Sequence, residues 1–151
     1  MKQKVLMFAI LVILALTDAG HVKAQIKNNP QSQDTLKIQN NEKLVILWSS
    51  GDREVALKMV FMYTYNAKKY EWWDDLTLLV WGPSAKLISE DKELQDYMGK
   101  IIESGVEVKA CKACSDMYGV SEKLEELGIN VNYIGKVLSD YIKEGRNILT
   151  L

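Results

Sequence analysis

Predicted strands alternate with helical patterns along most of this 151-residue chain, and this alternation constrains the fold more than any other feature. Residues 43–48 and 76–81 are nearly continuous apolar runs, typical of strands that are buried on both faces of a parallel sheet. Shorter strand candidates follow at residues 106–110, 130–134 and 147–151. We therefore expect an α/β fold: a three-layer sandwich in which about five mostly parallel strands are flanked by helices and joined by right-handed crossovers.

Helical patterns fill the intervals between these strands. They cover residues 53–69, a short turn that ends at residue 87, and residues 91–103, 112–118, 121–128 and 137–143. Ser50 or Asp52 is expected to cap the first helix, and Ser121 the helix that begins beside it. The first helix has apolar residues on more than one face, so we expect the sheet to cover one side and a partner subunit the other.

The first 24 residues have the pattern of a secretory signal peptide. Two lysines precede a nearly unbroken apolar run over residues 5–17, and residues 22–24 supply a cleavage site. The run is too short to span a bilayer comfortably, which favours cleavage after Ala24 over retention as an anchor. We therefore expect a periplasmic or secreted protein that is free of the membrane after cleavage.

Residues 25–42 are rich in Asn and Gln and have few large apolar residues, which predicts a flexible lead-in to a single domain over residues 43–151. The one histidine, His21, lies in the signal peptide, so the mature protein would have no Ser-His-Asp triad, Cys-His pair or histidine metal ligand. A net charge of −1 argues against a general nucleic-acid-binding protein. We expect no cofactor and no metal.

Three strand ends are expected to meet, because the carboxyl ends of parallel strands lie at one edge of a sheet and form the usual ligand crevice. The crevice candidates are Ser49, Ser50, Gly51 and Asp52 after the first strand, Trp81, Gly82, Pro83 and Ser84 after the second, and Lys112 after the third. The first loop could bind an anion through N–H groups at a helix start. Helix capping and chain reversal are the favoured interpretations of the first two loops.

The chain's two cysteines, Cys111 and Cys114, follow the third strand and share one face of the next helix. Thiolate is the reactive form of cysteine, and a helix N-terminus with Lys109 and Lys112 nearby would stabilise it on Cys111. The pair could cycle between dithiol and disulfide, or hold one reactive sulfur that the second resolves. A metal site needs about four ligands, which two thiolates do not supply. Both cysteines could instead be small core residues.

Residues 108–120 resemble the DsrE/DsrF-like family, with a strand, a cysteine at its end and a short helix that closes at Gly119. The resemblance extends to residues 50–52, 81–84 and 124–135, and it covers residues 43–151 as a whole. It implies a Rossmann-like fold assembled as trimers or hexamers. It also implies persulfide sulfur on a cysteine that matches Cys111, while Cys114 matches a second cysteine that only some members have.

These residues and this resemblance give three hypotheses. The first is an exported persulfide carrier or sulfur-relay component, in which Cys111 takes a sulfane sulfur and Cys114 resolves it as a disulfide. Its partners would be copies of itself, in a homotrimer or homohexamer, and a protein that donates or accepts sulfur. The second is a thiol-disulfide oxidoreductase that uses the same pair, and the third is a non-catalytic assembly module.

Overall fold

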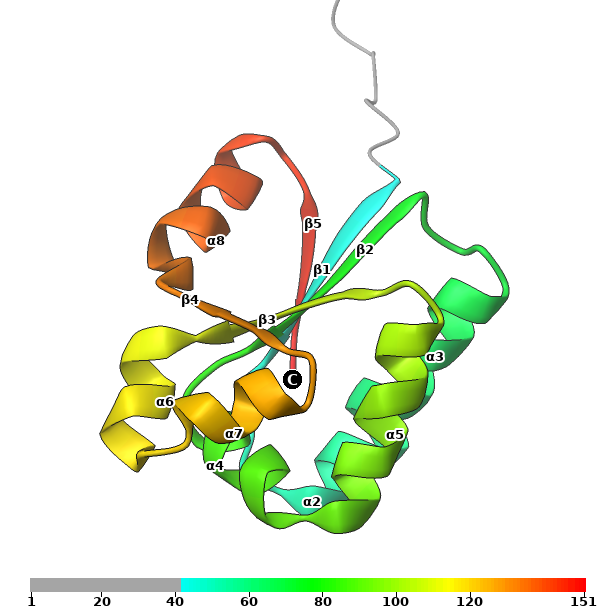
Figure 1. Ribbon diagram of the computed structural model, residues 1–151. Helices are drawn as coiled ribbons and strands as arrows, with labels where there is room; N and C mark the ends of the chain where they lie inside the picture. Colours follow the sequence, from blue (N-terminus) through cyan, green and yellow to red (C-terminus); the bar gives the residue numbers. More distant parts are fainter. Residues whose placement is uncertain (1–41) are drawn as a thin grey trace, which may run out of the picture. The chain divides into compact units, whose positions relative to one another are not determined.

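The computed structural model describes residues 42–151, which form a parallel five-stranded sheet with helices on both faces (Figure 1). The strands are β1 (Lys43–Trp48), β2 (Asp75–Val80), β3 (Glu107–Cys111), β4 (Asn130–Asn132) and β5 (Asn147–Thr150). They lie in the order β4-β3-β2-β1-β5, and every neighbouring pair is parallel. The predicted α/β class is confirmed. The predicted signal peptide and nearly all of the predicted lead-in lie outside the described residues.

Helices form the connections between the strands. They are α2 (Arg53–Val55), the π-helix η4 (Ala56–Phe61), α3 (Met62–Lys69), α4 (Pro83–Glu90), α5 (Lys92–Glu103), α6 (Lys112–Tyr118), α7 (Ser121–Glu126) and α8 (Ile134–Lys143). The path from β1 to β4 crosses the sheet in one direction, and α8 then returns the chain to β5 at the opposite edge. Because parallel crossovers are right-handed, this reversal places α8 on the face opposite to α3 and α5 (Figure 1).

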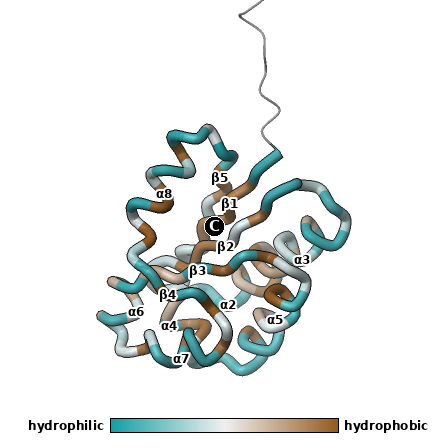
Figure 2. Tube along the Cα trace, turned by 45° about the horizontal axis from the view of Figure 1, so that its top comes forward, coloured by the Kyte–Doolittle hydropathy of each residue, from teal (hydrophilic) through white to brown (hydrophobic). Residues whose placement is uncertain are grey.

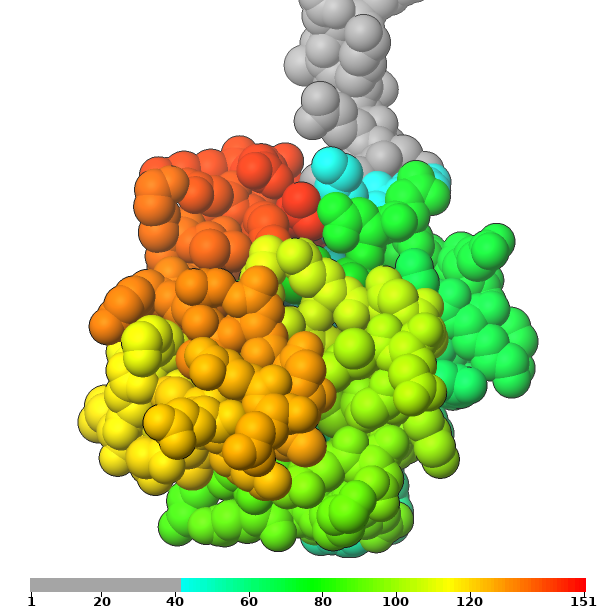
Figure 3. Space-filling view, in the orientation of Figure 1, coloured from blue at the N-terminus to red at the C-terminus, as the bar shows by residue number. Residues whose placement is uncertain are grey.

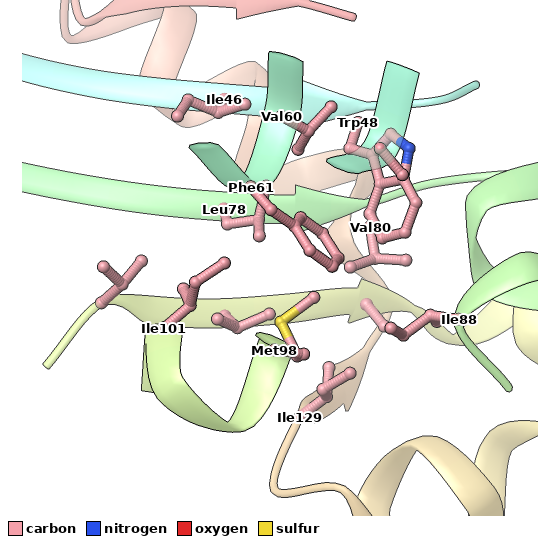
Figure 4. Packing of buried hydrophobic residues seen from close by; sticks show 14 of the residues in the cluster. Ile46, Trp48, Val60, Phe61, Leu78, Val80, Ile88, Met98, Ile101 and Ile129 are labelled. Atoms are coloured by element: carbon pink, nitrogen blue, oxygen red, sulfur yellow. The ribbon is translucent and has the colours of Figure 1, made fainter. Parts of the chain in front are cut away.

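The larger hydrophobic core fills the space between the sheet and helices η4, α3, α4, α5 and α7 (Figure 4). Side chains alternate between the faces of a strand, and the residues that point into this core from β1 and β2 are Leu44, Ile46, Trp48, Leu76, Leu78 and Val80. Phe61 meets Trp48 edge to face, with ring centroids 5.1 Å apart, a geometry that stabilises aromatic pairs. Five helices thus fix this side of the sheet.

A smaller hydrophobic core lies between α8 and the other face of the sheet. Its buried members are Val45, Leu79, Cys111, Ile134 and Tyr141. Apolar and polar residues alternate along α8, so that the helix covers the sheet with one apolar face (Figure 2). α8 is the helix that covers this face of the sheet, and Cys111 is part of the core beneath it.

Three helices differ from the sequence prediction. α8 begins at Ile134, a residue that the sequence assigns to a strand, because Ile134 continues the apolar face of the helix into the smaller core. Ser121 is the first residue of α7 and not its N-cap, since its hydroxyl donates to the Asp116 carboxylate at 2.6 Å. α4 continues past residue 87 to Glu90. Across residues 42–151, no helix is both long enough and apolar enough to cross a membrane.

Candidate functional site

The carboxyl ends of β1, β2 and β3 lie in register at one edge of the sheet. Trp48 pairs with Val80, and Val80 pairs with Ala110, the residue before Cys111. The segments that follow these strands therefore start side by side, and the candidate residues named from the sequence lie in them or at the end of β3. What each loop contributes depends on its own contacts.

The loop after β1 uses its polar groups within the fold. The N–H groups of Ser49 and Ser50 both donate to the main-chain oxygen of Leu151, at 2.7 and 3.3 Å. Asp52 caps α2, where its carboxylate accepts hydrogen bonds from two N–H groups of the first turn. These polar groups of the loop thus have hydrogen-bond partners within the chain, and Asp52 stabilises the start of the helix that follows.

The loop after β2 is fastened to the end of β1 by the buried residue Ser84. Its hydroxyl donates to the Trp48 carbonyl at 2.7 Å and accepts from the Trp81 N–H at 3.0 Å. The Trp81 N–H also lies 2.9 Å from the Trp48 carbonyl oxygen. The Ser84 side chain thus reinforces the main-chain hydrogen bond that joins the two strand ends.

These two loops also touch at their tips. A Cβ added to Gly51 would lie 3.1 Å from the Pro83 Cβ, so the close approach of the two loops favours glycine at this position. Gly82, with a φ of 68°, turns the chain sharply into α4. Trp81 instead packs on the smaller core beside Gly135 of α8. Trp81 is therefore the residue of these loops that shares a core with the cysteines.

Cys111 and Cys114 lie at the junction of β3 and α6. Cys111 ends β3 and is the N-cap residue of α6, and Cys114 lies on the first turn. Cys111 is 5% exposed within the smaller core, whereas Cys114 is only partly buried at its margin. Both are free cysteines, and their thiols are close enough to interact. The pair thus runs from the interior toward the surface at α6, whose yellow atoms are visible in Figure 3.

Burial is the largest influence on the Cys111 thiol, and it raises the pKa above the ordinary value for cysteine. The contact with the Cys114 thiol also raises this pKa, while the N–H groups of Cys114 and Ala113 lower it. The balance leaves the pKa raised. Cys111 is therefore a neutral thiol at neutral pH.

The two lysines that flank Cys111 are engaged by other groups. Lys109 Nζ lies 2.9 Å from the Tyr141 hydroxyl and 2.9 Å from a carboxylate on β3. Lys112 Nζ donates to both carboxylate oxygens of Asp116, at 2.8 and 2.9 Å. Their charges are balanced by these carboxylates, and burial governs the ionisation of Cys111. This differs from the expectation that the lysines stabilise a Cys111 thiolate.

Sequence reasoning missed the contribution of α8 to the site. Ile134 and Tyr141 pack in the same small core as Cys111. The signal was present in the sequence, because residues 134, 137, 138 and 141 follow the spacing of one helical face. The prediction began the helix at Val137 and so left out its first buried residue.

A surface hollow of about 350 Å³ lies beside α6 and α7, lined by Asp116, Gly119, Ser121 and Glu122. Neither cysteine lines this hollow. In the described part of the chain, no three His, Cys, Asp or Glu side chains gather in a way that could hold a metal ion. The two free thiols, Cys111 and Cys114, are the reactive groups considered for a chemical role.

The model of the DsrE/DsrF-like family matches residues 43–151, from the first residue of β1 to the end of the chain. The chain belongs to the DsrE/DsrF-like family.

Two solved structures are similar to this DsrE/DsrF-like protein. One is a conserved protein of unknown function, BT1422 from Bacteroides thetaiotaomicron, with 34% sequence identity and a TM-score of 0.72 over 76% of this chain and 98% of the other. The second is the ychN protein from E. coli, with 19% identity and a TM-score of 0.58 over 72% of this chain and 98% of the other. The second similarity concerns the fold alone. The curated proteins gave no match.

Proposed function

We propose that this DsrE/DsrF-like protein is a cysteine-based sulfur carrier, in which the Cys111–Cys114 pair receives sulfane sulfur from a donor and passes it on. The observation that carries the proposal is the position of the pair at the carboxyl end of β3. That edge is where parallel α/β sheets present their functional groups, and it is where the family resemblance puts a sulfur-carrying cysteine.

The smaller core suits Cys111 to hold sulfur as a persulfide. Apolar side chains of β1, β2 and α8 surround the Cys111 sulfur and would keep water away from the reactive S–S bond. Cys114 is close enough to resolve that persulfide. Its thiol attacks the inner sulfur, the S–S bond of the persulfide breaks, and the outer sulfur leaves as hydrogen sulfide while a Cys111–Cys114 disulfide forms.

The crevice residues have two roles in this proposal. Trp81 packs at the margin of the core that contains both cysteines, and Lys112 follows Cys111 directly, so these two side chains border the approach to the sulfur. The loops of residues 49–52 and 82–84 act indirectly, because their hydrogen bonds and close contact fix the strand ends beside β3.

A thiol-disulfide oxidoreductase is the second candidate, favoured by the contact between two free thiols on one turn. The two candidates differ in what the pair transfers: a sulfur atom in one case, two electrons in the other. A reduction potential between about −270 and −120 mV, the range of known exchange proteins, would support the oxidoreductase. A non-catalytic assembly module predicts that Cys111→Ser changes stability alone.

The proposal also covers location and assembly. A signal peptide over residues 1–24, cleaved after Ala24, would place the carrier in the periplasm or outside the cell. A homotrimer or homohexamer would cover the exposed apolar side chains of η4 and α3, and a separate protein would donate or accept the sulfur.

Mass spectrometry of the reduced protein after treatment with inorganic polysulfide tests the sulfur carrier. The expected result is a mass gain of about 32 Da, one sulfur atom, on a peptide that contains the pair, and its loss on addition of a reductant. The Cys111→Ser/Cys114→Ser double variant is the control and should gain nothing. A wild-type protein that neither gains sulfur nor forms the Cys111–Cys114 disulfide with release of hydrogen sulfide would contradict the proposal.

A further inference from the structure

The two thiols differ in how far a sulfur donor can approach them. Cys111 is 5% exposed and packs with Val45, Leu79, Ile134 and Tyr141. Transfer of sulfur requires the attacking thiolate to meet the donor in line with the S–S bond that breaks, and a sulfur enclosed on this scale leaves no room for a donor. Cys114 lies at the margin of the same core and is partly exposed.

The electrostatic surroundings of Cys111 agree with its burial. Desolvation raises the pKa of this thiol, and the neighbouring lysines are paired with Tyr141, with a β3 carboxylate and with Asp116. The N–H groups of Ala113 and Cys114 favour the thiolate, but burial outweighs them, so Cys111 offers little thiolate to a donor that comes from solvent. The buried sulfur is suited to keep a sulfur atom, and it is poorly suited to collect one.

From this gradient of exposure we infer that Cys114 is the first acceptor of sulfur and that Cys111 receives it second, by transfer within the pair. The inference rests on the proposed sulfur-carrier function and adds the order in which the cysteines act. It reverses the assignment suggested by the sequence, in which Cys111 meets the donor and Cys114 only resolves it.

The first step uses a small persulfide, R–S–SH, or an inorganic polysulfide as the donor. The Cys114 thiol releases its proton, and the thiolate attacks the outer sulfur of the donor. The donor's S–S bond breaks, its electron pair leaves with R–S⁻, and this thiolate takes up a proton to become R–SH. The product is Cys114–S–SH, with no net oxidation or reduction.

The second step passes the sulfur inward. Cys111 attacks the outer sulfur of Cys114–S–SH, and the bond between the two sulfurs of that persulfide breaks. The proton from the Cys111 thiol goes to the Cys114 thiolate that leaves, so the products are Cys111–S–SH and Cys114–SH. Contact between the two side chains makes this step intramolecular, which compensates for the weak ionisation of Cys111.

The test compares the initial rate of sulfur uptake from inorganic polysulfide in the full-length protein and in two single variants, by mass spectrometry at short times. Cys114→Ser should slow uptake by about tenfold or more, because the accessible thiolate is gone. Cys111→Ser should still take up sulfur from polysulfide and hold it on Cys114, because only the second step is blocked. Each variant is the matched control for the other, since both exchange one sulfur atom for oxygen.

Three results would overturn the inference: wild-type uptake by Cys114→Ser, loss of uptake in a folded Cys111→Ser protein, or faster alkylation of Cys111 than of Cys114 in the wild type. The alkylation measurement needs no variant, so it decides the order of the thiols even if Cys111→Ser fails to fold. The sulfur-carrier function fails separately, when the wild-type protein itself takes up no sulfur.

Discussion

The Cys111 sulfur lies among aliphatic and aromatic side chains, and these surroundings decide how it ionises. A thiolate there would lose its hydration without gaining a free cation, because Lys109 and Lys112 are held by other partners. At the scale of single residues, the different proposed roles of Cys114, the first sulfur acceptor, and Cys111, the second, therefore follow from their different burial.

The raised pKa of Cys111 predicts how its alkylation rate depends on pH. Alkylation requires thiolate, so in Cys114→Ser the reaction of Cys111 with iodoacetamide should accelerate only at a pH above that at which free cysteine ionises. The shift should survive this substitution, since burial is its largest cause. Quantitative mass spectrometry over a pH series measures the profile. The urea-unfolded variant is the control, and equal profiles in the two states would contradict the prediction.

The same shift has a definite sign in stability. The folded state holds the Cys111 proton more tightly than the unfolded state does, so its contribution is complete below the ordinary cysteine pKa. It is lost as the pH rises from that ordinary value through the raised one, because the unfolded chain releases the proton first.

Two glycine substitutions separate backbone strain from steric space. Gly82→Ala has free space around the new Cβ, but its φ of 68° and ψ of −133° are unfavourable for an L-residue, and it should destabilise by about 1–3 kcal/mol. Gly99→Ala, in the middle of α5 and also free of contacts, should stabilise by about 1 kcal/mol through helix propensity. Urea unfolding measures both. A change of the same sign in the two variants would contradict the assignment to backbone conformation.

At the scale of secondary structure elements, α8 is the helix that covers the face of the sheet with the smaller core. It covers the sheet face that contains Cys111, and Lys109 connects it to β3 through the Tyr141 hydroxyl. The Arg146 guanidinium lies over the Tyr141 ring, 4.2 Å from its centroid, and pairs with Asp75 at the start of β2. Tyr141 is thus the point at which α8 is attached to the sheet.

Tyr141→Phe should keep the ring and lose the hydrogen bond to Lys109. We expect a loss of about 1–2 kcal/mol in the free energy of unfolding, because the donor is charged and largely shielded from solvent. Tyr133→Phe is the matched control: this hydroxyl is on a side chain that is 70% exposed, and the change should stay within about 0.5 kcal/mol. Equal effects at the two positions would show that the Lys109 contact does not anchor α8.

Many of the strands and helices could be predicted from the sequence. β1 and β2 are continuous apolar runs between turn residues, so their place in a parallel sheet followed from composition and spacing. The start of α8 was misassigned, because Asn130 to Ile134 also fits a short strand. The helical spacing of residues 134, 137, 138 and 141 was the local signal for the earlier start, and the burial of Ile134 in the smaller core agrees with it.

Part of the candidate site could also be predicted from the sequence. That the loops after β1, β2 and β3 lie at one edge follows from the parallel order alone. Which charges act on Cys111 depends on side-chain partners such as Tyr141, 32 residues from Lys109 in the chain. The local sequence suggested a thiolate on Cys111; the N–H groups of Ala113 and Cys114 do lower its pKa, but burial in the smaller core raises it by more.

At the scale of the whole molecule, the helical segment after β1 presents apolar side chains outward. Met59 and Met62 are each about half exposed, although the same segment buries Val60 and Phe61 against the sheet, and Trp72 in the turn after α3 is exposed to a similar extent. The π-helical turn η4 lies within this segment, next to the junction with α3. Exposed methionine and tryptophan side chains are typical of a surface that another protein covers.

Light scattering tests the proposed self-association through this surface. The wild-type protein should have the mass of a trimer or hexamer, and Met59→Glu/Met62→Glu should lower it toward that of the monomer, because burying the new carboxylates is unfavourable. Lys100→Glu, at an exposed position of α5, is the control and should leave the mass unchanged. A monomeric wild-type protein would contradict the assembly.

The central claim is that the Cys111–Cys114 pair carries sulfur, and its most direct test is the state of the pair in the cells that make the protein. The thiols are trapped with an alkylating agent at harvest, and the peptide that contains both is analysed by mass spectrometry. A sulfur carrier predicts a fraction with one extra sulfur atom, which grows when the cells receive reduced sulfur and vanishes after reduction. Two thiols that remain unmodified under both conditions, or a disulfide that never changes, would contradict it.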